Sequence, residues 1–159
     1  MTVTTLEWIG KVPSGRVRLI DQTLLPSREE YLERTDYADL ADDIRRLAVR
    51  GAPAIGVAAA FGVVLGVQGC SGLAREAFMN RLNEVCDQLA GARPTAVNLF
   101  WAIDRMRKTA HNLPSGTLPE QIIKILEKEA LEIFEEDRRL CRAIGENGAG
   151  LIQDGARVL

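Results

Sequence analysis

The sequence has few of the residues from which disulfide frameworks and metal sites are built. Its three cysteines, Cys70, Cys86 and Cys141, lie far apart and form no CxxC pair. Neither a disulfide framework nor a zinc site is therefore predicted, and a reduced, cytoplasmic protein is favoured. His111 is the only histidine, and we interpret it as a helix-end residue rather than a catalyst.

A strong charge of one sign is also missing. The formal net charge is −2, and the two tryptophans, two tyrosines and four phenylalanines do not interleave with a basic patch. These features argue against nucleic acid or an anionic membrane as a partner. The first five residues contain no basic stretch leading into an apolar one, so no secretory signal is indicated. The 159 residues, 47% of them hydrophobic, suit one globular domain with its own core.

One long stretch has almost no ionisable groups. Residues 51–74 carry no acid or base other than the thiol of Cys70. Although this length raises the question of a membrane span, the glycines, the proline and the polar residues within it favour a tightly packed internal helix followed by a turn. Arg50 and Gly51 stand at its edge. Either Gly51 caps a preceding helix, or Arg50 and the amides after it hold an anion at the next helix start.

Alternation and helical spacing predict a fold of the α+β class. Strands are predicted at residues 6–9 and 16–20. Helices are predicted at residues 36–51, 53–67 and 71–90, from about residue 95, and at residues 117–144. Because the second helix is apolar on every side, we expect it in the middle of a bundle. The predicted architecture is a short N-terminal β-hairpin or small antiparallel sheet packed on a bundle of about five helices.

Several side chains are predicted to cap these helices. Asp36 is expected to cap the first helix and Thr95 the fourth. Thr117 and Glu120 have the spacing of a capping box for the fifth helix.

Other charged side chains are predicted to lie on helix surfaces. Asp42 and Arg46 are expected to form an i,i+4 pair. The many charges of the fifth helix, including Glu127, are assigned to its solvated side without a catalytic role. Asp137 falls near the apolar stripe of that helix. It is expected to pair with an arginine or to cap a backbone group, and a role in a site stays open.

A second arginine precedes a helix start. Arg93 is followed by Pro94, and a residue before proline is pushed to an extended conformation. Arg93 therefore stands where a cation and free helix amides could meet an anion; the alternative is a solvated loop arginine. The following helix carries apolar residues on two faces, so we expect it to be deeply buried or shared with another domain.

Four motifs occur in order at residues 19–26, 49–56, 93–99 and 144–149. Together they resemble the N-terminal half of the methylthioribose-1-phosphate isomerases, and the likeness covers almost all of the chain. The same superfamily includes ribose-1,5-bisphosphate isomerases and the regulatory subunits of a translation-initiation guanine-nucleotide exchange factor. The Arg-Gly-Ala-Pro and Arg-Pro-Thr-Ala-Val-Asn motifs favour the methionine-salvage isomerase over these relatives.

The resemblance implies a substrate and a reaction. In that family the Arg-Gly-Ala segment and the arginine of Arg-Pro-Thr bind a sugar phosphate, which assigns substrate binding to Arg50, Gly51, Ala52 and Arg93. The family converts 5-methylthioribose 1-phosphate, a cyclic aldose, to the open-chain ketose 5-methylthioribulose 1-phosphate without a metal or other cofactor. Since the anomeric oxygen is phosphorylated, an acid must protonate the ring oxygen before hydrogen moves from C2 to C1.

The resemblance also implies that the catalytic acid and base lie outside this chain. The family assigns them to a cysteine in a Thr-His-Cys-Asn segment and to an aspartate, both in a C-terminal Rossmann-like domain. No cysteine here lies in such a segment. Residues 1–153 are expected to form the N-terminal domain, and residues 154–159 to open the first strand of the absent domain. The chain alone is therefore expected to be inactive, with the missing half and homodimer formation completing the enzyme.

Two other functions stay open on the sequence. A regulatory subunit would bind a nucleotide or a phosphosugar without turning it over. A purely structural helical module would need neither Arg50 nor Arg93 for anything beyond stability.

Overall fold

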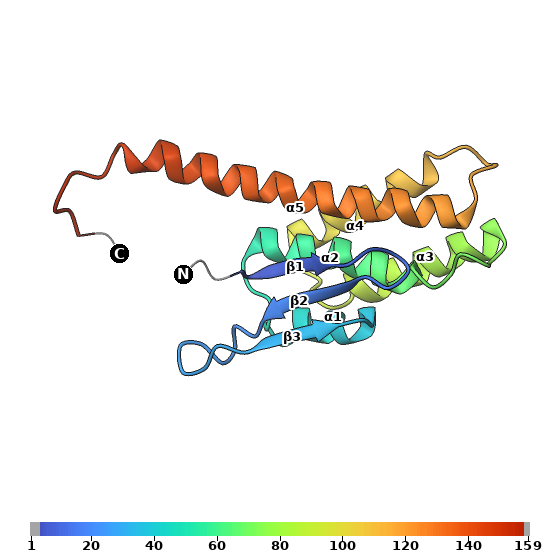
Figure 1. Ribbon diagram of the computed structural model, residues 1–159, viewed down its shortest axis with the longest axis horizontal. Coiled ribbons are helices and arrows are strands. Elements are labelled where there is room, and N and C mark those ends of the chain that lie inside the picture. Colours follow the sequence, from blue (N-terminus) through green and yellow to red (C-terminus); the bar gives the residue numbers. More distant parts are fainter. Residues whose placement is uncertain (1–3, 158–159) are drawn as a thin grey trace.

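The computed structural model describes residues 4–157 and contains a small antiparallel sheet and a bundle of five helices (Figure 1). The strands are β1 (Leu6–Ile9), β2 (Arg16–Ile20) and β3 (Tyr31–Arg34). The helices are α1 (Tyr37–Arg45), α2 (Ala52–Val67), α3 (Arg75–Ala90), α4 (Val97–His111) and α5 (Pro119–Ala149). The α+β architecture predicted from the sequence is confirmed, and the small-sheet alternative is the one realised.

The sheet has the order β1-β2-β3, with both pairs antiparallel. Val17 and Leu19 are buried under the helices, while Arg16 and Arg18 point away from the core, as their alternation predicts. β3 was not among the predicted strands. Its four residues are all at least partly exposed, so they lack the alternation of buried and exposed positions that identifies a strand from sequence.

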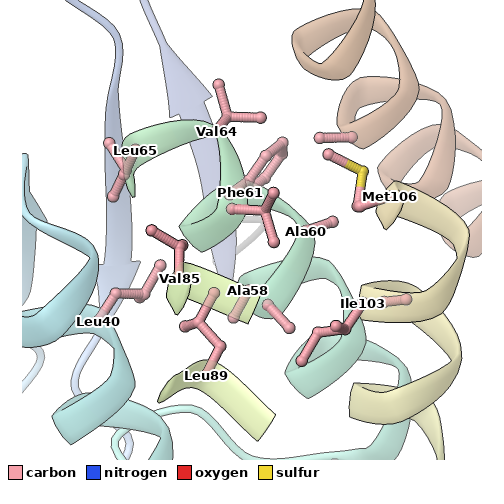
Figure 2. Close-up of a cluster of buried hydrophobic side chains, with 14 of the residues drawn as sticks. Leu40, Ala58, Ala60, Phe61, Val64, Leu65, Val85, Leu89, Ile103 and Met106 are labelled. Carbon is pink, nitrogen blue, oxygen red and sulfur yellow. The ribbon is translucent and has the colours of Figure 1, made fainter. Parts of the chain in front are cut away.

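The core is organised around α2. Every residue of α2 from Ile55 to Val67 is buried, and α1, α3, α4 and α5 all pack against this helix. The ring of Phe61 lies 5.6 Å from that of Trp8 and 5.9 Å from that of Phe134, measured between centroids. Figure 2 shows Phe61 among aliphatic side chains from the surrounding helices. The prediction of a central helix, apolar on all sides, is confirmed.

The end of α1 differs from the prediction. The helix ends at Arg45 rather than at residue 51. Leu47 has a φ of 65°, and the amides of Leu47 and Ala48 donate to the carbonyls of Ile44 (3.3 Å) and Asp43 (2.9 Å). This is a Schellman motif, in which glycine usually takes the left-handed position. Leucine there costs on the order of 1–2 kcal/mol.

Gly51 accordingly does not cap α1. It is the N-cap residue of α2, with a φ of 92°. The first of the two interpretations offered for Gly51 is therefore wrong, and the position still favours glycine because of its positive φ.

The capping predictions have mixed outcomes. Asp36 caps α1 and accepts a hydrogen bond from the Ala38 amide at 2.8 Å, as predicted. Thr95 does not cap α4, whose N-cap residue is Ala96. The capping box predicted for α5 does not form, because the N-cap residue is Leu118, whose side chain cannot accept a hydrogen bond; only the return bond is present, in which Gln121 accepts from the Leu118 amide at 3.1 Å.

Glu127 links the N-terminal strand to α5. Its Oε1 accepts hydrogen bonds from the Trp8 indole (3.0 Å) and the Val12 amide (2.9 Å). The prediction that Glu127 belongs only to a solvated helix face is therefore wrong. It satisfies the indole N–H of a ring that is packed against the core.

Within residues 4–157, no helix combines the length and apolar character needed to cross a membrane. No cluster of three or more metal-ligating side chains occurs in the same range. His111 is the last residue of α4, as predicted. The strand expected to open at residues 157–159 is not tested, because residues 158 and 159 lie outside the described residues.

Candidate functional site

Two helix N-termini lie together at one end of the bundle. α2 and α4 both begin there (Figure 1), and they pack so closely that a Cβ on Gly56, in the second turn of α2, would lie 2.9 Å from the carbonyl oxygen of Asn98 in the first turn of α4. Neither helix start has a capping side chain or an acidic residue in its first turn. Because the first amides of a helix have no intrahelical partner, both starts present N–H donors and the positive ends of helix dipoles.

The first turn of α2 is open to solvent. Gly51 and Ala52 are exposed, and a Cβ on Gly51 would meet no atom of residues 4–157 within 4 Å. Pro53 has no N–H, so the amides of Ala52 and Ala54 are the donors that this turn offers. The arrangement suits an anion that approaches the backbone from outside.

The two arginines predicted to bind an anion precede these two helix starts. Arg50 is exposed, and its Nε donates to the Leu47 carbonyl at 3.1 Å. Arg93 is half-buried, and its carbonyl accepts from the Ala96 amide at 3.0 Å in the turn that opens α4. In the part of the chain that the structure describes, neither guanidinium forms an ion pair. The structure therefore brings the two predicted segments to the same end of the bundle.

A groove of about 370 Å³ lies between these helix starts and α5. Its lining is mostly apolar and includes Val97 and Trp101 of α4, together with Glu136 and Asp137 of α5. Val97 is 78% exposed and Trp101 is 49% exposed. One face of α4 is thus buried in the bundle, and its second apolar face is open, in keeping with a helix shared with another partner.

Of the two carboxylates in the groove, Glu136 pairs with an arginine among residues 4–157 and Asp137 does not. Glu136 accepts from Arg105 Nη2 at 2.9 Å, and this hydrogen bond lowers the pKa of Glu136. Asp137 pairs with no arginine and caps no backbone group in the described range, contrary to the prediction. It accepts instead from the Cys141 thiol, with 3.6 Å between Sγ and Oδ1. Asp137 also borders a second hollow, of about 210 Å³, between β1 and α5.

Two of the three cysteines, Cys86 and Cys141, have thiols with raised pKa values. Cys86 is buried in the core, as predicted, and burial raises its pKa to about 11. The Asp137 carboxylate raises the pKa of the exposed Cys141. Thiols with raised pKa values are protonated at neutral pH and are poor nucleophiles.

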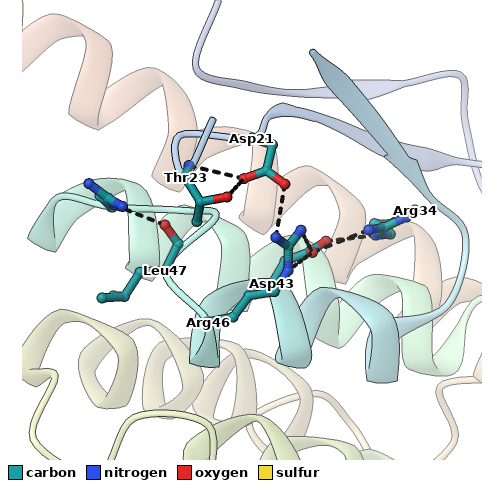
Figure 3. Close-up of polar contacts among 7 residues, drawn as sticks. Asp21, Thr23, Arg34, Asp43, Arg46 and Leu47 are labelled. Carbon is teal, nitrogen blue, oxygen red and sulfur yellow. Dashed lines mark hydrogen bonds and ion pairs between the residues drawn. The ribbon is translucent and has the colours of Figure 1, made fainter. Parts of the chain in front are cut away.

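A network of charged side chains that the sequence did not reveal lies beside the α1–α2 connection (Figure 3). The guanidinium of Arg46 contacts Asp21 at 2.8 Å and Asp43 at 2.6 Å. Asp43 also pairs with Arg34 at 2.6 Å. The predicted pairing of Arg46 with Asp42 is therefore wrong.

The partner of Arg46 carried only a weak signal in the sequence. Asp21 accepts hydrogen bonds from the amide (3.0 Å) and hydroxyl (2.6 Å) of Thr23. An Asp-x-Thr sequence is typical of such a turn, but it does not indicate a partner on another element.

The sequence matches the Initiation factor 2 subunit family over residues 48–159. The chain belongs to this family. Among its relatives is the methylthioribose-1-phosphate isomerase of Geobacter metallireducens, which is 50% identical over 159 residues, all of this chain and 44% of that protein. The isomerase of Petrotoga mobilis is 47% identical over 157 residues, 98% of this chain and 44% of that protein. The chain thus spans less than half the length of these relatives, and its predicted resemblance to their N-terminal part is confirmed.

Solved structures give the same relationship. The translation initiation factor eIF-2B subunit delta from A. fulgidus is similar with a TM-score of 0.84 and 36% identity, over 97% of this chain and 43% of that one. The 5-methylthioribose 1-phosphate isomerase from Pyrococcus horikoshii OT3 is similar with a TM-score of 0.76 and 34% identity, over 83% of this chain and 36% of that one.

Proposed function

We propose that this chain is the N-terminal part of a cytoplasmic methylthioribose-1-phosphate isomerase of methionine salvage and that it binds the phosphate group of the substrate. One observation carries the proposal: two uncapped helix starts, each preceded by an arginine without an ion-pair partner in the described range, lie at the same end of the bundle. The identity of 50% to an isomerase of that name supports the choice of substrate.

The proposed binding mode follows from the donors present. The phosphate accepts hydrogen bonds from the amides of Ala52 and Ala54, above the open backbone of Gly51, and from the guanidinium groups of Arg50 and Arg93. Charge-assisted bonds of this kind are shorter and stronger than neutral ones. The phosphate is attached to C1 through the anomeric oxygen, so binding it holds the adjacent C1 and C2 atoms in place for the proton transfers.

The proton transfers themselves are assigned to the part of the relatives that this chain does not span. An aldose-to-ketose conversion needs an acid at the ring oxygen and a means of moving hydrogen from C2 to C1. The chain alone is therefore expected to bind the substrate without turning it over. The open apolar face of α4 and the outer turns of α5 are the surface on which we expect the rest of the enzyme to pack, and the complete enzyme is expected to be a homodimer.

Calorimetric titration of the chain with 5-methylthioribose 1-phosphate tests the binding mode. Arg50→Ala and Arg93→Ala should each weaken binding about tenfold or more, equivalent to about 1.4 kcal/mol. Arg45→Ala is the matched control, because Arg45 is exposed on α1 and its one ion pair among the described residues is with Asp42. Unchanged affinity in both site variants would contradict the proposal.

A second function is favoured by one observation, the TM-score of 0.84 to a chain described as a translation initiation factor subunit. A regulatory subunit would bind a nucleotide or phosphosugar and give no product under any conditions. The chain should therefore be mixed with a separately produced C-terminal part of the Geobacter metallireducens isomerase. Formation of the ketose supports the isomerase, and complete inactivity of a complex that does assemble supports the regulatory function. Competition with ribose 1,5-bisphosphate as a ligand distinguishes the proposed isomerase from a ribose-1,5-bisphosphate isomerase, the third member of the superfamily.

A further inference from the structure

The segment that carries Arg50 starts from a strained turn. It leaves α1 at Arg46 and passes through Leu47, whose φ of 65° is unfavourable for a leucine. A residue held in this region persists only where its surroundings over-determine the conformation. The contacts that hold the turn therefore decide where Arg50 and Gly51 lie.

Arg46 supplies the ion pairs at the start of this turn. Its guanidinium bridges two carboxylates on different parts of the fold, with 2.8 Å to Asp21 and 2.6 Å to Asp43. The side chains of these aspartates are only 7% and 1% exposed. A buried carboxylate is costly unless a cation and hydrogen-bond donors satisfy it, so the pairing determines the position of Arg46 and, with it, the start of the turn.

The same network holds the far side of the turn. The amide of Gln22, next to Asp21, donates to the Ala48 carbonyl at 3.1 Å, directly after Leu47. The loop after β2 is thus joined to the turn by the Asp21–Arg46 ion pair, drawn in Figure 3, and by one backbone hydrogen bond. Ala48 and Val49 are buried, and the chain returns to the surface at Arg50, directly before α2.

The Asp21 carboxylate is charged at neutral pH. Burial raises its pKa, but the hydrogen bonds from Thr23 and Arg46 together hold the pKa below its ordinary value. The motif at residues 19–26, which the substrate contacts leave unexplained, thereby acquires a role.

We infer that Arg46, held by Asp21 and Asp43, is a positioning residue that fixes the turn at Leu47 and so places Arg50 and the first amides of α2 for binding a phosphate. Arg46 itself does not touch the phosphate. The inference rests on the proposed function for its ligand and on the ion pairs for its geometry.

A double-mutant cycle on affinity for 5-methylthioribose 1-phosphate tests this role. Arg46→Gln should weaken binding about tenfold in the wild-type chain but about twofold or less in Arg50→Ala, because most of its effect is the displacement of the Arg50 guanidinium and only the remainder is the displacement of the α2 amides. In Arg93→Ala the full tenfold loss should remain. Arg45→Gln, one residue earlier on the surface of α1, should change nothing, and Arg46→Lys should recover part of the loss.

Losses for Arg46→Gln and Arg50→Ala that simply add, or no loss for Arg46→Gln, overturn the inference. Asp21→Asn, which keeps the size of the side chain, takes the place of Arg46→Gln in the cycle if that variant does not fold.

Amide hydrogen exchange tests the geometry without any ligand. Arg46→Gln should raise the exchange rates of the Gln22 and Ala48 amides about tenfold or more, while amides in the middle of α2 keep theirs. Unchanged rates overturn the inference. If Arg50→Ala and Arg93→Ala leave affinity unaltered, the proposed function fails, and the exchange rates still show whether Arg46 holds the turn.

Discussion

The two halves of α5 have similar amphipathic sequences and opposite surroundings. In the first half, Leu126 and Ile133 are 0% and 2% exposed against the bundle. In the second half, Leu140 and Ile144 are 63% and 72% exposed, on turns that extend beyond the other helices (Figure 1). Periodicity specifies which face of a helix suits burial. Whether that face is buried depends on which elements pack against it. The candidate groove lies at the point along α5 where the other helices of the bundle end.

The two halves should differ most in how much stability each loses when a leucine is replaced by alanine. Leu126→Ala is expected to lower the free energy of unfolding by about 2–5 kcal/mol, because it leaves a cavity in the core. Leu140→Ala should change it by no more than about 0.5 kcal/mol, since the side chain is already in solvent. Urea denaturation followed by circular dichroism measures both, and equal losses would show that the outer half is packed in solution.

A smaller effect is expected at the boundary between the halves. Arg105 on α4 pairs with Glu129 and Glu136 on α5, and all three side chains are partly exposed. Arg105→Met should cost about 1 kcal/mol at neutral pH. Lys124→Met, which removes an exposed pair with Glu120, is the control and should cost less.

The stability lost in Arg105→Met should decrease as the pH falls. Arg105 lowers the pKa of Glu136 in the folded protein, so the pair contributes stability above the unfolded pKa of about 4.3 and loses it as pH falls through the folded value. The difference between wild type and Arg105→Met should therefore shrink below about pH 4. A difference that is constant with pH would assign the effect of Arg105 to packing alone.

The smallest effect concerns thiol reactivity. Cys141, on the outer half of α5, should react with iodoacetamide in the folded protein, while Cys86 should react only on unfolding. Asp137→Asn should speed the Cys141 reaction a few-fold near pH 7.5, because the carboxylate raises the pKa of that thiol. Peptide mapping by mass spectrometry gives both rates, with Glu146→Gln as the control. An unchanged rate in Asp137→Asn would mean that Asp137 does not face Cys141 in solution.

Local patterns in the sequence were sufficient for most of the fold. The position of α2 at the centre followed from a stretch without charges, and the Asp36 cap followed from its residue type. The end of α1 could not be predicted, because it is fixed by an ion pair between Arg46 and Asp21, 25 residues apart in the chain. β3 was missed because none of its residues is fully buried.

The candidate site, too, could be predicted from the sequence only in part. An arginine before a helix start is a local feature, so Arg50 and Arg93 could be named from the sequence. The contact between Gly56 and Asn98, which brings the two helix starts together, is a property of packing that no spacing contains. Which side chains of α5 face the groove likewise depends on the position of that helix along the bundle, and the sequence does not specify this position.

The hydrogen bonds of Glu127 bear on how the domain is completed during synthesis. Trp8 and Glu127 are 119 residues apart, so at about 5–20 residues per second the indole waits about 6–24 s for its acceptor. The pairing of β1 with β2 is local and needs only the first turn-forming residues. The small sheet can therefore assemble on the ribosome early, but it can dock onto α5 only after four helices have been made, and the first strand to be translated is among the last to reach its final contacts.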